Sequence, residues 1–205
     1  MRFGKFLLAR RATQLGILAL FLAGPLAGLW IVKGNLNFSY TLNFLPLADP
    51  YVLAQSLLAR HAPEAKALLG AAIVLALYLV VGGRVYCAWV CPMNMVTDAA
   101  AWLRAKLGVH SSTYLSRATR YWILAMTLVV TLVTGSIAWE LVNPVSMLHR
   151  GLIFGFGAAW AVVLAVFLFD LFVASRGWCG HLCPVGAFYS LLGRFAVLRV
   201  SAVRR

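Results

Sequence analysis

The sequence predicts an all-α integral membrane protein with four transmembrane helices, and three observations support this fold class. Hydrophobic residues make up 63% of the 205 residues and charged residues only 11%, whereas a soluble domain carries about a quarter charged residues. Four apolar stretches approach the roughly 20 residues that a membrane-spanning helix needs. Two of these stretches lead into a Cys-x-x-x-Cys-Pro motif. We therefore expect a single membrane domain over residues 1–205.

The four stretches are predicted to span the membrane at about residues 14–32, 67–83, 121–139 and 152–174. The first follows a basic N-terminal segment, as a signal peptide would, but its apolar run is too long for one, so we expect an uncleaved helix. The second lies at the short end of the range for a span, and we expect it to continue into the motif that follows it.

The distribution of basic residues predicts the orientation, because Lys and Arg collect on the cytoplasmic side of a bacterial inner membrane. With the N-terminus in the cytoplasm, 14 of the 18 Lys and Arg residues fall on that side. Both termini are therefore expected to be cytoplasmic. The net charge of +13 then predicts contact with anionic lipid rather than nucleic acid, since the basic residues are clustered between apolar runs.

A short amphipathic helix is predicted in the first outer loop, at about residues 49–60. Asp49 followed by Pro50 is typical of an N-cap with Pro at the first helical position. Three leucines of the segment share one face, so we expect the helix to lie flat on the outer membrane surface. In the second outer loop, Asn143-Pro144 predicts a turn.

The two motifs form an internal repeat. Arg84-Val-Tyr-Cys87-Ala-Trp-Val-Cys91-Pro92 follows the second stretch, and Arg176-Gly-Trp-Cys179-Gly-His-Leu-Cys183-Pro184 follows the fourth, with a spacing of 92 residues. Arg, an aromatic residue, both Cys and Pro occupy the same offsets. Each unit is a pair of helices followed by the motif, which predicts two parallel repeats related by an axis along the membrane normal.

All four cysteines, Cys87, Cys91, Cys179 and Cys183, belong to these motifs and are candidate metal ligands. Helical residues at i and i+4 have Cβ atoms about 5–6 Å apart, too far for a disulfide, and the cytoplasm is reducing. Four thiolates suit one iron–sulfur cluster or a zinc ion. A position at the membrane surface favours iron–sulfur or dithiol redox chemistry, with inert buried thiols as the alternative. The Pro after each second Cys should bend or end the helix there.

Arg84 and Arg176 each lie three residues before the first Cys of a motif. A nearby cation lowers the pKa of a thiol and favours the thiolate that binds metal. We expect both arginines to supply this supporting charge. The alternative is that they anchor the helix ends at the membrane surface, and the two roles are compatible.

The chain resembles the NapH family, ferredoxin-type membrane subunits of the quinol dehydrogenase that feeds periplasmic nitrate reductase. The resemblance covers essentially the whole chain. The matching segments are Gly24-Pro25 with Trp30, Leu47-Ala-Asp49-Pro50, Cys87-Ala-Trp-Val-Cys91-Pro92-Met-Asn94 with Thr97-Asp98, Trp139-Glu140-Leu-Val-Asn143-Pro144-Val-Ser146, Phe169-Asp170-Leu, and Gly177-Trp-Cys179-Gly-His181-Leu-Cys183-Pro184-Val-Gly-Ala. Membrane proteins of nitrous oxide reduction and methylamine oxidation share the paired motifs, but these longer matches favour the nitrate system.

The resemblance implies a membrane electron-transfer component that belongs to an oxidoreductase complex and depends on partner subunits. It would oxidise quinol from the quinone pool and pass the electrons to the iron–sulfur protein NapG, and from there to a cytochrome c and the reductase. The family also has a cytoplasmic domain with two four-cysteine runs. The printed sequence ends at Arg205 without them, as a truncated or naturally short form would, so those clusters are not carried over.

Three residues are candidates for handling the protons of a quinol. Asp170 and Glu140 are carboxylates within or at the end of predicted spans, where ionisable groups are costly and often functional. His181 lies inside the second motif. Asp170 could instead pair with Arg84 or Arg176, and Glu140 could cap its helix or pair with Arg150 in the outer loop. The sequence places no two His residues in facing spans, so no haem is expected.

Two other functions remain open from the sequence. A membrane anchor or assembly scaffold would use the cysteines structurally, so that Cys→Ser changes would leave electron flow intact. A small transporter would need broken helices or several charged residues along a pore, and the predicted spans contain neither beyond Asp170.

Overall fold

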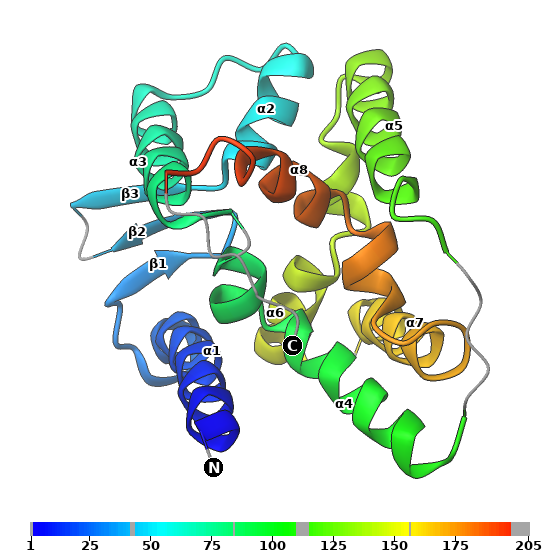
Figure 1. Cartoon of the computed structure of the whole chain (residues 1–205). Helices are drawn as coiled ribbons and strands as arrows, with labels where there is room; N and C mark the ends of the chain where they lie inside the picture. The colour runs from blue at the N-terminus through cyan, green and yellow to red at the C-terminus, as the bar shows by residue number, and fades with distance from the viewer. Residues whose placement is uncertain (1, 42–43, 84, 110–114, 156, 198–205) are drawn as a thin grey trace.

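The computed structural model describes residues 2–41, 44–83, 85–109, 115–155 and 157–197 (Figure 1). Helices dominate, and a small antiparallel sheet lies between the first two long helices. In chain order the elements are α1 (Arg2–Ala27), β1 (Val32–Gly34), β2 (Phe38–Thr41), β3 (Leu45–Ala48), α2 (Pro50–Leu58), α3 (Ala65–Val81), the π-helical turn η1 (Tyr86–Val90), α4 (Met93–Lys106), α5 (Thr119–Thr134), the 3₁₀ turn η2 (Ala138–Leu141), α6 (Pro144–Phe154), α7 (Ala158–Phe172), the π-helical turn η3 (Trp178–Leu182) and α8 (Pro184–Leu192).

The prediction of four transmembrane helices is wrong. Within the described ranges one helix, Lys5–Ala27, is long and apolar enough to cross a membrane, and the other apolar helices are shorter: Ala65–Val81, Thr119–Thr134 and Ala159–Phe172. The longest of these three has 17 residues. At 1.5 Å per residue it covers about 26 Å, less than the roughly 30 Å of a bilayer core.

Glycine residues explain why the apolar stretches make shorter helices than predicted. α5 ends at Thr134, where Gly135 turns the chain with a φ of 65°. The stretch 152–174 is divided between α6 and α7 at Gly155, which has a φ of 85°. Such values are readily adopted only by glycine. Two further predictions were inferred from the four spans: the parallel helix-pair repeats and the cytoplasmic placement of both termini. Because the four spans are not found in the part of the chain that the structure describes, neither prediction is supported by them any longer.

The sheet is a second departure from the all-α prediction. Its strands follow one another in the order β1-β2-β3 and pair antiparallel, with Lys33 opposite Tyr40 and Tyr40 opposite Pro46. α3 packs across β3 (Figure 1). At the crossing a Cβ atom on Gly70 would lie 2.9 Å from the carbonyl oxygen of Pro46, so the backbone of α3 can approach the sheet only without a side chain there.

The short helix of the first loop begins as predicted. Asp49 is the N-cap of α2, and its Oδ1 accepts a hydrogen bond of 2.9 Å from the backbone N–H of Tyr51. Tyr51 and Gln55 are fully buried, and α2 contacts α3 and α5. Its position on an outer membrane surface stays a prediction. Asn143-Pro144 begins α6 in the same way, with Asn143 as the N-cap, where a turn was predicted.

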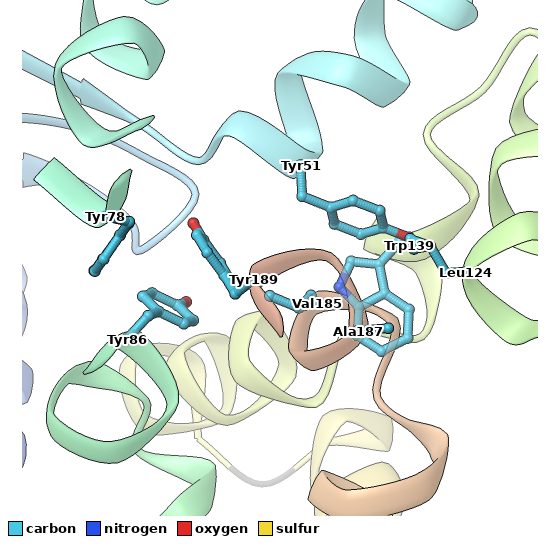
Figure 2. Close-up of a cluster of buried hydrophobic side chains, with 8 residues drawn as sticks. All are labelled: Tyr51, Tyr78, Tyr86, Leu124, Trp139, Val185, Ala187 and Tyr189. Carbon is cyan, nitrogen blue, oxygen red and sulfur yellow. The ribbon is translucent and has the colours of Figure 1, made fainter. Parts of the chain in front are cut away.

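The main hydrophobic core joins the two halves of the chain (Figure 2). Its buried members come from α2, α3, η1, α5, η2 and α8: Tyr51, Tyr78, Tyr86, Leu124, Trp139, Val185, Ala187 and Tyr189. α8 lies between α3 and α5 in Figure 1 and contacts both. The ring of Tyr189 stacks on that of Tyr86, with centroids 4.9 Å apart, and meets Tyr78 edge-on at 5.0 Å.

We expect Gly83→Ala to destabilise the protein. A Cβ atom there would lie 2.0 Å from the carbonyl oxygen of Tyr189, so α8 would have to move away from the end of α3. Overpacking of this kind costs about 1–3 kcal/mol, and the melting temperature in mild detergent should fall. Gly16→Ala is the matched control, because no atom lies within 4 Å of the added Cβ. Equal melting temperatures for both variants would contradict the prediction.

Candidate functional site

The two Cys-x-x-x-Cys-Pro motifs adopt the same local structure. Each forms a π-helical turn closed by a hydrogen bond between residues five apart: Cys91 N–H to the Tyr86 carbonyl at 3.0 Å, and Cys183 N–H to the Trp178 carbonyl at 2.9 Å. The second Cys of each motif then leaves the helix, with ψ of 117° and 113°. The following Pro disfavours α geometry at these cysteines, so the predicted end of the helix at each Cys-Pro is confirmed.

The four thiols, separated by up to 96 residues in the sequence, line one pocket. Cys87 and Cys91 come from the first motif, and Cys179 and Cys183 from the second; all four side chains are half-buried. The pocket is completed by residues of η2, α6 and α8, including Trp139, Asn143 and Val185. The internal repeat therefore brings two pairs of sulfur ligands to a common site.

The four thiols can be compared with the ligand sets of a zinc ion and of an iron–sulfur cluster. Around a single zinc ion the sulfurs lie about 2.3 Å from the metal and hence about 3.8 Å from one another. In the described part of the chain no three His, Cys, Asp or Glu side chains are grouped so that they could hold one metal ion. Cluster ligands bind different iron atoms and are spread more widely, and four cysteines are the ordinary ligand set of a [4Fe–4S] cluster.

An indole N–H with no acceptor also belongs to this pocket. Trp139 lines it and is 5% exposed, and its Nε1 is buried without a hydrogen-bond partner among the described residues. Figure 2 shows this nitrogen on the side of the ring that faces Val185, a residue that also lines the pocket. Buried donors are rarely left unpaired, so the orphaned N–H indicates a ligand with an acceptor atom, such as a cluster sulfur.

Burial controls the protonation of the thiols. It raises the pKa of Cys179 and of Cys183 to about 12 and that of Cys91 well above its usual value, and the neighbouring cysteines add to each rise. The sequence predicted the opposite direction, from Arg84 and Arg176. Metal binding must therefore displace protons from these thiols.

Arg176 pairs with a carboxylate other than Asp170, the partner that the sequence suggested for it. Its guanidinium forms an ion pair of 2.9 Å with Asp98 of α4, and no ion pair with Asp170 is found within the described residues. Arg84 lies outside the described residues. The supporting-charge role of the two arginines stays a prediction.

Polar residues of α1 hold the first motif in place, which the sequence analysis did not foresee. Gln14 is fully buried, and its Nε2 donates to the backbone carbonyls of Ala88 at 3.0 Å and Cys91 at 3.3 Å. Arg10 Nε donates to the Ala88 carbonyl at 2.6 Å. A buried amide within an apolar helix was the available signal, because such a group needs partners.

Asp98 connects this arrangement to the second motif. Its carboxylate pairs with Arg11 of α1 at 2.5 Å as well as with Arg176, which lies just before η3. Next to it, Thr97 is 2% exposed, and its hydroxyl contacts the sulfur of Cys179 at 3.9 Å. Adjacent residues of α4 thus bind the N-terminal helix and the second motif of the cysteine site.

The three predicted proton-handling residues do not line the cysteine pocket. Asp170 is fully buried in α7; its Oδ1 accepts from the Trp178 backbone N–H at 2.9 Å, and its Oδ2 has no partner within the described residues. Glu140 pairs with Arg150 at 3.7 Å. His181 lies in η3, with its Nδ1 buried and unpaired among the described residues. Their roles with a quinol stay predictions.

The comparison with family models supports an iron–sulfur site. A model described as a 4Fe-4S binding domain matches residues 66–110 and again residues 156–202. Each match contains one Cys motif, so the repeat seen in the sequence is a repeat of this domain. No solved structure matches the chain.

Curated proteins match the chain from end to end. The methylamine utilization ferredoxin-type protein MauN of Methylorubrum extorquens is 55% identical over 100% of this chain and 71% of its own length. The ferredoxin-type protein NapH is 51% identical in Haemophilus influenzae and 45% identical in Escherichia coli, each over 98% of this chain and 70% of the relative. These identities, together with the 4Fe-4S match, indicate an electron-transfer role. The chain belongs to the family of ferredoxin-type proteins that includes NapH and MauN.

Proposed function

We propose that this protein transfers electrons through one iron–sulfur cluster held by Cys87, Cys91, Cys179 and Cys183. The observation that carries the proposal is the convergence of these four thiols on one pocket from two matching motifs. When bound, the cluster supplies one-electron chemistry without proton transfer. The two matches to a 4Fe-4S binding domain favour a cluster over zinc, dithiol chemistry and inert thiols.

The surrounding residues fix the ligands and set the environment of the site. Gln14 and Arg10 bind the carbonyls of the first motif, so the backbone that carries Cys87 and Cys91 cannot rotate freely. Trp139 provides an N–H donor toward the site. Hydrogen bonds to cluster sulfurs stabilise the reduced, more negative state and so raise the reduction potential.

In this proposal the electrons come from quinol and leave to a partner iron–sulfur protein. The resemblance to NapH supports this direction, with a NapG-type protein and a cytochrome c as the following carriers and periplasmic nitrate reductase as the destination. The chain would then act as a subunit of a quinol dehydrogenase and would depend on its partners for turnover. Nitrate itself would not bind here.

Association with a membrane is part of the proposal, because quinol dissolves in lipid. α1 contains a segment long and apolar enough to cross a bilayer. Large apolar side chains are also exposed on other helices, such as Trp122 at 77%, Val133 at 79% and Phe154 at 84%. Large apolar side chains exposed on several helices agree with a membrane or protein interface.

Methylamine oxidation is a second candidate destination for the electrons. The MauN relatives of Methylorubrum extorquens and Paracoccus denitrificans are 55% and 56% identical to this chain. Deletion of the gene in its host is expected to lower nitrate-dependent quinol oxidation by membranes several-fold and to leave methylamine-dependent respiration unchanged. The reverse result would assign the protein to methylamine oxidation.

Cluster binding can be measured on protein purified without oxygen in mild detergent. We expect about four iron and four acid-labile sulfide per chain, and loss of both in Cys91→Ser or Cys183→Ser, because each change removes one of the four ligands. Thr134→Ala, an exposed hydroxyl on α5, is the control and should keep both. Zinc without sulfide, or cysteine variants that keep electron transfer, would favour a structural site in a membrane anchor.

Replacement of the indole tests the environment of the site. Trp139→Phe is expected to lower the midpoint potential of the cluster, measured by redox titration with electron paramagnetic resonance, because the N–H donor is lost while the ring is largely retained. The iron content should stay the same. Trp160→Phe is the matched control, since Trp160 is absent from the lining of the cysteine pocket. Equal potentials in both variants would show that the Trp139 N–H does not reach the cluster.

A further inference from the structure

A second pocket shares two wall residues, Asp49 and Tyr86, with the cysteine pocket. Its volume is about 350 Å³, within the range of about 300–1,000 Å³ that is typical of sites for small organic ligands. Its walls come from α1, the sheet, α3, η1 and α8. They are mostly apolar, with Phe21, Val74 and Leu77 among them, so the pocket is suited to a ligand with a large apolar part.

The polar end of the pocket is the carboxylate of Asp49, which is 6% exposed. Its Oδ1 accepts two hydrogen bonds, from the Tyr51 backbone N–H at 2.9 Å and from the Tyr189 hydroxyl at 3.0 Å. Within the described residues neither hydrogen bond uses Oδ2, so this oxygen is available to a ligand. Burial raises the pKa of Asp49 to about 6, so the group can exchange a proton near neutral pH.

Tyr189 fixes the orientation of this carboxylate and is a positioning residue. Its ring is 1% exposed and packs against the rings of Tyr78 and Tyr86 (Figure 2). The hydroxyl is therefore held in one direction, toward Asp49. The carboxylate of Asp49 is in turn held at the wall that the two pockets share.

We propose that this pocket binds a quinol, with a ring hydroxyl donating to Oδ2 of Asp49 and the apolar tail lying between α1 and α3. The inference rests on the proposed function, from which it takes quinol as the electron donor. In the step assigned to Asp49, the O–H bond of the bound hydroxyl breaks. The proton moves to the carboxylate, and the electron pair of the bond stays on the ring oxygen. The anion formed would give up one electron more readily than the neutral quinol, and Cys87, Cys91, Cys179 and Cys183 would hold the iron–sulfur cluster that takes it up.

Access from the apolar surface agrees with this ligand. Leu20 of α1 and Leu77 of α3 line the pocket and are 42% and 56% exposed. They therefore form its rim on the outside of the molecule. Because α1 carries the apolar segment long enough to cross a membrane, a lipid-dissolved ligand can reach the rim without passing through water. None of Asp170, Glu140 and His181 lines this pocket.

The first test is to fill the rim. Leu77→Trp should raise the dissociation constant of decylubiquinone about tenfold or more, measured by calorimetry on the whole chain in detergent, because the indole occupies space that the ligand needs. Leu164→Trp is the matched control: Leu164 is 55% exposed on α7, and it does not line the pocket. If Leu77→Trp protein that contains iron and sulfide binds decylubiquinone with wild-type affinity, the pocket assignment is overturned. The proposed function is not affected by that result.

The second test separates proton transfer from binding. Asn is as good an N-cap as Asp and keeps an oxygen for Tyr189, but it cannot take up a proton. Asp49→Asn should therefore keep the iron content, while reduction of the cluster by a saturating concentration of decylubiquinol in stopped flow slows about a hundredfold. An unchanged rate would overturn the role of Asp49. Wild-type protein without iron and sulfide would instead overturn the proposed function, and the calorimetry would still decide whether the pocket binds the ring.

Discussion

Two backbone hydrogen bonds, each between residues five apart, set the geometry on which the candidate site depends. An α-helical turn would stack the two cysteines of a motif on one face and continue into the next turn. The wider π-helical turn, followed by an extended Cys and a Pro, directs the second thiol away from the helix axis. Single π-helical turns are rare and are found mostly at functional sites. Since both motifs adopt this turn, the two halves of the chain contribute matching pairs of ligands.

The site is joined to the rest of the protein by polar contacts as well as by the core. Gln14 and Arg10 reach from α1 to the first motif, and Asp98 binds both α1 and the residue that precedes the second turn. Salt bridges on an exposed surface contribute little to stability, but the side chain of Asp98 is only 13% exposed. Buried, well-partnered polar groups favour one arrangement over others. The helix that can enter a membrane is thereby fixed in position against the cysteine pocket.

The starts and ends of individual helices were predictable from the sequence. The lengths of the apolar helices and the tertiary contacts were not. Asp49-Pro50 predicted the start of α2, and the repeated motif predicted a shared site with helix ends at Cys91 and Cys183. The four spans failed because hydropathy does not register where Gly135 and Gly155 turn the backbone. The sheet was missed because its strands have only three or four residues. Asp49 was recognised only as a helix cap, since its second role depends on Tyr189, 140 residues away in the sequence.

The division of the four thiols between two repeats has a consequence for biosynthesis. A nascent chain that has emerged as far as Cys91 offers two sulfurs and no complete ligand set, because the other pair lies about 90 residues later. The cluster that we propose can therefore be inserted only after the second repeat has been translated and has packed against the first through Tyr86, Tyr189 and their neighbours. Iron content would then report on the folding of the whole chain. A variant that weakens the contact between the repeats should be recovered as metal-free protein even though all its cysteines are intact.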